Sequence, residues 1–151
     1  MRLGITRRQS LALGAGAFAA AAAGTSPARA AKGEAEALIK AFAGGREPVQ
    51  GRVKLDLPEI AENGNTVPMA VTVESPMTAE SHVTDILVVA DANPRAAVVT
   101  FHFTPSSGVA EANTRIRLAE TQTVVAVARM NDGSVFMDQR PVKVTIGGCG
   151  G

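Results

Sequence analysis

The chain has 151 residues, of which 46% are hydrophobic and only five are aromatic, all of them Phe, so its length supports one domain with an aliphatic core. Its formal net charge of +1 hides an asymmetry: without the four basic residues among the first thirty, 11 Lys and Arg stand against 14 Asp and Glu, a net charge of −3. This remainder has no basic run and few aromatic rings, which argues against nucleic acid as a ligand.

Residues 1–30 are typical of an export signal rather than of a folded element. Arg7-Arg8 lies in a segment that resembles the twin-arginine export motif, and an apolar stretch over residues 11–23 follows it. That stretch is too short and too weakly hydrophobic for a membrane-spanning helix, which needs about 20 apolar residues. Ala28-Arg29-Ala30 fits a cleavage site. We therefore predict a mature protein that begins near Ala31, lies in the periplasm and has no membrane anchor.

The next segment, residues 31–50, predicts a short helix and a linker. The apolar residues between Glu34 and Ala43 recur at helical spacing, and Gly44 is a stop signal.

From residue 51 to residue 146 the hydrophobic period changes to two, which predicts β-strands. Seven runs carry this pattern: Arg52–Leu57, Thr66–Glu74, Val83–Ala90, Ala97–Phe103, Thr114–Leu118, Thr123–Met130 and Pro141–Ile146. Asp132-Gly133 predicts a tight hairpin turn, and the last run predicts Val142, Val144 and Ile146 on the inward face. About seven short strands separated by turn signals favour an all-β sandwich of immunoglobulin type, without the disulfide and Trp of antibody domains.

The chain ends in Gly147-Gly148-Cys149-Gly150-Gly151, which contains its only cysteine. Because glycine has little conformational preference, we predict that residues 147–151 form a flexible arm with a reach of about 17 Å. A single cysteine excludes an internal disulfide, and the absence of a C-x-x-C-H sequence excludes c-type haem attachment.

No other residues predict a catalytic or metal site. His82 and His102 are the only histidines, too few with one mobile cysteine to form a protein-built metal site, and we expect ordinary strand residues and no cofactor. Arg115 and Arg117 lie on one face of their strand, where solvent or a partner covers them. The tail offers no cation or helix N-terminus to activate Cys149. The thiol is therefore expected to carry a substrate for other enzymes, with no catalysis by this chain.

The terminal motif resembles that of the SoxY family, the sulfur-carrier subunits of the bacterial Sox thiosulfate-oxidising system. Three internal stretches are also similar, namely residues 58–64, 114–118 and 144–146. The resemblance implies an immunoglobulin-like fold and a heterodimer with SoxZ. It implies that SoxXA loads thiosulfate onto Cys149 as an S-thiosulfonate, that SoxB releases sulfate, and that SoxCD, where present, oxidises the remaining persulfide. Gly147, Gly148, Gly150 and Gly151 would then provide the arm with flexibility and clearance.

Two other functions compete with this hypothesis. The protein could be an exported interaction module that dimerises through a Cys149 disulfide. A ubiquitin-like carrier that uses the carboxylate of Gly151 is a weaker alternative, because that chemistry needs adenylation by ATP and an exported protein would not meet ATP. The sequence leaves open which surface binds SoxZ and whether SoxCD takes part.

Overall fold

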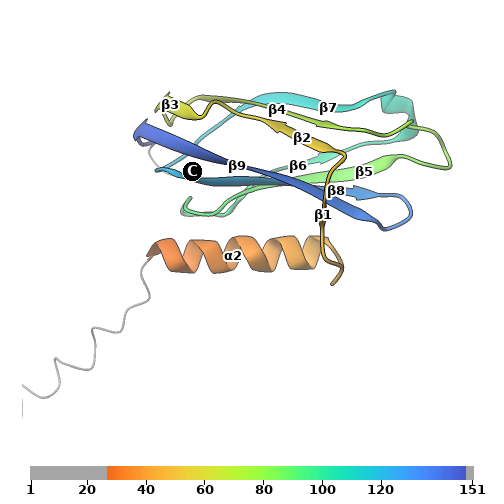
Figure 1. Cartoon of the computed structure of the whole chain (residues 1–151), viewed down its shortest axis with the longest axis horizontal. Coiled ribbons are helices and arrows are strands. Elements are labelled where there is room, and N and C mark those ends of the chain that lie inside the picture. Colours follow the sequence, from red (N-terminus) through yellow and green to blue (C-terminus); the bar gives the residue numbers. More distant parts are fainter. Residues whose placement is uncertain (1–26, 149–151) are drawn as a thin grey trace, which may run out of the picture.

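Two β-sheets face each other in the computed structural model of the protein, which describes residues 27–148 (Figure 1). The strands are β1 (Val49–Gln50), β2 (Val53–Asp56), β3 (Ile60–Asn63), β4 (Val67–Val73), β5 (Val83–Ala90), β6 (Ala97–His102), β7 (Ala110–Ile116), β8 (Gln122–Met130) and β9 (Val135–Ile146). The larger sheet has the order β1-β9-β8-β5-β6, with β3 also paired to β9, and the smaller has the order β2-β4-β7. This arrangement confirms the predicted all-β, immunoglobulin-like sandwich.

All seven predicted runs form strands, and two further strands were not predicted. β1 has two residues, too short to show a period of two, and β3 has four residues of which only Ala61 is buried. β9 begins at Val135, six positions before the predicted start, because the polar residues 138–140 interrupt its alternation. Asp132-Gly133 does form the β8–β9 turn, where Gly133 has φ +83° and its N–H donates to the Met130 carbonyl at 2.9 Å.

The core lies between the two sheets, and a second apolar layer lies under the helix α2 (Pro27–Phe42). β5 is buried along nearly its whole length because one face meets the smaller sheet and the other meets α2. Leu87 and Val89 of β5 pack with Leu38 and Ile39 of the helix. The continuous apolar run in β5 therefore reflects coverage on both faces, which the sequence pattern had left open.

The helix is longer at its start than the predicted Glu34–Ala43. It ends at Phe42, and Gly44 follows in the left-handed region at φ +63°, where glycine is favoured. The predicted cleavage site at residues 28–30 lies in its first turn, and the helix side chains described in the apolar layer on the sheet are Ala35, Leu38, Ile39 and Phe42. Residues 1–26 lie outside the described residues. No helix within residues 27–148 is long and apolar enough to cross a membrane.

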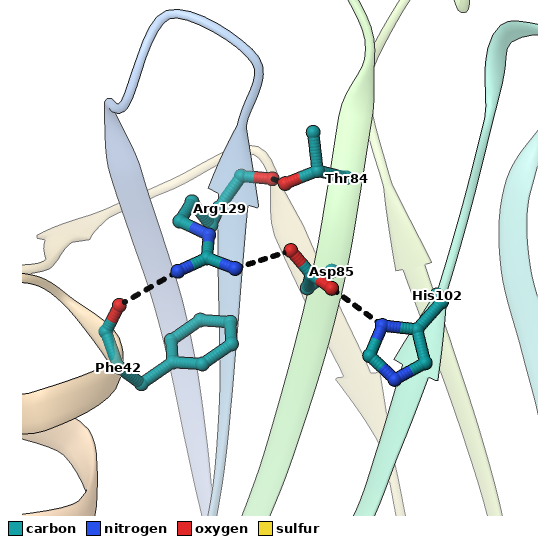
Figure 2. A network of polar contacts seen from close by, with 5 residues as sticks. All are labelled: Phe42, Thr84, Asp85, His102 and Arg129. Carbon is teal, nitrogen blue, oxygen red and sulfur yellow. Dashed lines mark hydrogen bonds and ion pairs between the residues drawn. The ribbon is translucent and has the colours of Figure 1, made fainter.

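A polar network attaches the end of α2 to the larger sheet (Figure 2). The Arg129 guanidinium donates to the Asp85 carboxylate at 2.6 Å and to the Phe42 carbonyl at 3.4 Å, and it lies over the Phe42 ring. His102 Nδ1 lies 2.6 Å from the other Asp85 oxygen. Burial, the largest influence, raises the pKa of Asp85, but the hydrogen bonds from Arg129 and His102 outweigh it and leave that pKa below its usual value.

Side chains of β9 also connect the two sheets. The Leu55 N–H of β2 donates to Asp138 Oδ2 at 2.9 Å, and Arg140 Nε donates to the Leu55 carbonyl at 3.1 Å. Asp138 and Arg140 form an ion pair at 3.3 Å. The edge of β2 is therefore bonded to side chains of the strand that leads to the C-terminal arm.

Candidate functional site

β9 is the strand from which the arm departs, and it is paired along both edges. β8 covers one edge from Val135 to Val142. On the other edge β1 pairs with the first part of β9, and β3 runs parallel to its last residues, with Asn63 opposite Ile146. Beyond Val142, where β8 no longer pairs, the Val144 N–H donates to Thr121 Oγ1 at 3.0 Å. The end of the strand is therefore held on both sides, and a short arm can project from it.

Backbone hydrogen bonds hold the first residues of the arm. The Gly148 N–H donates to the Leu118 carbonyl at 2.9 Å, and the Leu118 N–H donates to the Gly64 carbonyl at 2.8 Å. The Gly64 N–H donates to the Ile146 carbonyl at 2.7 Å. These bonds bring the β3–β4 turn, the segment after β7 and the end of β9 together at one end of the sandwich, where Figure 1 shows β3 beside the end of β9.

The glycines at this junction leave no space for side chains. A Cβ on Gly64 would overlap the Leu118 carbonyl oxygen and lie 2.8 Å from the Gly148 nitrogen. A Cβ on Gly148 would lie 2.8 Å from the Gly64 oxygen, and one on Gly147 would overlap the Ala119 oxygen. Gly64 and Gly148 are both buried. Close backbone packing therefore requires these three glycines.

A buried amide pair fixes the segment on which the arm rests. Asn93 is 2% exposed; its Nδ2 donates to the Arg117 carbonyl and its Oδ1 accepts from the Ala119 N–H, both at 2.9 Å. Gln122 Nε2 donates to the same Oδ1 at 2.8 Å and to the Glu120 carbonyl at 3.0 Å. These bonds orient the Leu118 and Ala119 carbonyls toward Gly148 and Gly147. Sequence reasoning missed this network, because Asn93 directly precedes Pro94 and such a pair has a common local explanation as a turn.

The predicted site residues fall into two groups. Cys149, Gly150 and Gly151 lie outside the described residues. Gly147 and Gly148 lie within the described residues and pack against backbone, which explains on steric grounds why both positions are glycine. Their role as a flexible part of the arm stays a prediction. Val144 packs against the core as predicted, but Ile146 was predicted to face inward, which is wrong: it is 65% exposed, because the strand leaves the core beyond Val144.

The two histidines that the sequence singled out lie away from this junction, and the two arginines lie on the exposed surface. His82 Nδ1 contacts the Thr78 carbonyl at 2.9 Å, and His102 belongs to the Asp85 network. Arg115 and Arg117 are exposed as predicted, and Arg115 donates to Thr66 Oγ1 at 3.3 Å. Within residues 27–148, no three His, Asp or Glu side chains gather as metal ligands.

Comparisons with known proteins point in one direction. Residues 39–149 match the family described as "Sulfur oxidation protein SoxY". Among solved structures, the sulfur carrier protein SoxY from Chlorobium limicola f. thiosulfatophilum is 29% identical with a TM-score of 0.63, over 76% of this chain and 94% of that one. No curated protein sequence matches significantly.

More distant structures share the fold alone. A superoxide reductase (neelaredoxin) from Ignicoccus hospitalis has a TM-score of 0.55 at 16% identity, over 62% of this chain and 80% of that one. A variant of the Archaeoglobus fulgidus enzyme has a TM-score of 0.51 at 18% identity, over 63% and 90% of the two chains.

Proposed function

Since the chain belongs to the SoxY family of sulfur oxidation proteins, we propose that it carries thiosulfate-derived sulfur on Cys149 in the bacterial periplasm. One observation carries the proposal: the family match extends to Cys149, the residue directly after the anchored Gly148. The cysteine therefore follows a fixed backbone position at the end of the sandwich, which suits presentation of a thiol to other proteins.

The proposed loading step forms an S–S bond between Cys149 Sγ and the outer sulfur of thiosulfate. The thiol proton leaves to solvent, and two electrons pass to the haem enzyme SoxXA. In the next step water cleaves the bond to the sulfonate group, sulfate departs through SoxB, and a persulfide remains on Cys149. SoxCD, in systems that contain it, then oxidises that outer sulfur.

The surroundings of the arm support a carrier rather than an enzyme. The described contacts of Gly147 and Gly148 are with backbone groups of Leu118, Ala119 and Gly64. None of these groups is a general base or a cation that could activate a thiol. The chemistry therefore belongs to partner enzymes that receive the arm, with SoxZ as the proposed heterodimer partner.

The test moves the cysteine while keeping the cysteine count. Cells that depend on thiosulfate oxidation would carry the wild type, Cys149→Ser, or Cys149→Ser combined with Ser106→Cys. Ser106 is exposed in the short 3-10 helix η1 (Pro105–Ser107), which precedes β7. The first residue of β7, Ala110, pairs with Val73, at the end of β4 that is remote from Gly64. We expect sulfate formation with the wild type only.

Sulfate formation by Cys149→Ser would contradict the proposal, and sulfate formation by the relocated cysteine would show that the arm is unnecessary. If the wild type forms only a disulfide-linked dimer that Cys149→Ser lacks, and Cys149→Ser oxidises thiosulfate normally, the interaction module is the correct function.

A further inference from the structure

The junction at the base of the arm is more ordered than a flexible tail requires. It consists of Gly64, Leu118 and Gly148, joined by two successive N–H···O=C bonds, and we call it the backbone lock. Its members come from the β3–β4 turn, the segment after β7 and the start of the arm. Each bond is therefore a tertiary contact between distant parts of the chain.

The glycines of the lock are required by proximity and not by backbone dihedral angles. Among the described residues, the glycines in the left-handed region are Gly44, Gly45, Gly51, Gly108 and Gly133. Gly64, Gly147 and Gly148 have ordinary φ values, so other residues could adopt their conformations. What excludes a side chain at each is the opposing backbone, at a distance below that of any normal Cβ contact.

We infer that Gly64 is a positioning residue for Cys149, an inference that rests on the proposed function. Gly64 accepts the hydrogen bond that holds Leu118, and Leu118 accepts the one that holds Gly148. A side chain on Gly64 would enter the space between the Leu118 oxygen and the Gly148 nitrogen, and so would break the bond that anchors the arm.

The lock determines how far the thiol travels from the domain. When it is closed, the Cys149 Cα is one residue, about 3.8 Å, from the fixed Gly148. When it is open, the last fixed residue is Ile146, three residues away, and the Cα reaches about 10 Å. A closed lock also means that two residues are already ordered before a partner binds, so less conformational entropy is lost on binding.

The first test measures amide hydrogen exchange of the lock by NMR in the full chain, with no sulfur chemistry. We expect the Gly148 N–H of the wild type to be protected. In Gly64→Ala the protection of this amide should fall by at least about tenfold relative to core amides such as that of Val88. The reason is that the hydrogen bond from Gly148 to Leu118 is no longer formed, so the amide exchanges without first breaking it.

Two matched controls separate the lock from general destabilisation. Gly33→Ala adds a methyl group in open space. Gly108→Ala places a side chain at φ +73° in an exposed turn and so destabilises the fold. Gly108 lies just before β7, whose first residue Ala110 pairs at the end of β4 remote from Gly64, so this substitution does not touch the lock. Both should keep the exchange ratio of Gly148 to Val88. If Gly64→Ala does not fold, Gly148→Ala replaces it, because a Cβ on residue 148 would crowd the Gly64 carbonyl oxygen across the same contact. The amide exchange of residue 148 is then measured in that variant.

The second test measures loading of thiosulfate by SoxXA. The kcat/KM should fall by about tenfold in Gly64→Ala, because Gly147 and Gly148 would have to become ordered when the arm binds SoxXA. It should stay unchanged in Gly108→Ala. An unprotected Gly148 amide in the wild type, or wild-type loading and exchange in a folded Gly64→Ala, would overturn the inference. A protected amide in a wild type that accepts no sulfur would support the lock and contradict the proposed function.

Discussion

The junction at the arm changes how the terminal glycines are understood. Composition predicts a flexible tether over all five residues 147–151, yet Gly147 and Gly148 pack against the backbone of Ala119 and Gly64. A sequence cannot show this, because Gly64 is brought to the arm only by the pairing of β3 with β9. The glycine-rich motif thus has an anchored half before the cysteine, where close packing explains the residue type.

At the scale of single residues, the account depends on the buried Asn93. We expect Asn93→Ala to lower the free energy of unfolding by about 1–3 kcal/mol, because the Arg117 carbonyl and the Ala119 N–H would lose their partners in a partly buried place. Urea denaturation measures the change. It should be accompanied by faster exchange of the Gly148 amide.

Asn113→Ala is the matched control for this prediction. Asn113 is exposed, and the hydrogen bond described for its side chain goes to Glu111 at 2.9 Å, so its substitution should change the free energy of unfolding by less than about 0.5 kcal/mol. Equal effects of the two substitutions would contradict a specific role for the Asn93 network.

At the scale of elements, the network that attaches α2 should make stability depend on pH. The pKa of Asp85 is lowered in the folded protein, so the carboxylate contributes stability above its ordinary pKa of 3.8, and that stability is lost as the pH falls through the folded value. We expect Asp85→Asn to lower the free energy of unfolding by about 1–3 kcal/mol at pH 7, with the difference from wild type shrinking as the pH falls below 3.8.

Urea unfolding between pH 2 and pH 7 measures this difference, and Asp56→Asn is the control because Asp56 is exposed on β2. A gap between the wild type and Asp85→Asn that stays constant down to pH 2 would show that the ionised carboxylate is not the source of the stability.

The elements also show where sequence reasoning succeeds. Strands with a clear period or a long apolar run were predicted closely, and β5 was predicted with its observed bounds, Val83–Ala90. β3 was missed because its stability comes from parallel pairing with β9 rather than from its own pattern, and only Ala61 of its four residues is buried. Ile146 was placed inward by alternation, but alternation says nothing about where a strand leaves the core.

The candidate site was predictable only in part for a related reason. Cys149 follows from cysteine count and terminal position. The Gly64 contact and the Asn93–Gln122 pair join segments distant in sequence, and each residue type there has a common local explanation as a turn or loop residue.

At the scale of the whole molecule, the sandwich serves as a rigid support for its last residues. The core and both edges of β9 hold the strand, and α2 covers the opposite face of the larger sheet from the smaller one (Figure 1). The α2 side chains that the structure describes in the apolar layer against the sheet are Ala35, Leu38, Ile39 and Phe42, and the predicted cleavage would retain them. We therefore expect a mature protein that begins near Ala31 to keep this packing.

The most direct test is the intact mass of the mature protein, purified from the periplasm of thiosulfate-grown cells and measured with and without reductant. The account predicts a chain beginning near Ala31 that carries sulfur or thiosulfonate adducts, all removed by reductant and all mapped by fragmentation to Cys149. A bare thiol under these conditions, or a disulfide dimer as the only modified species, would contradict the carrier function.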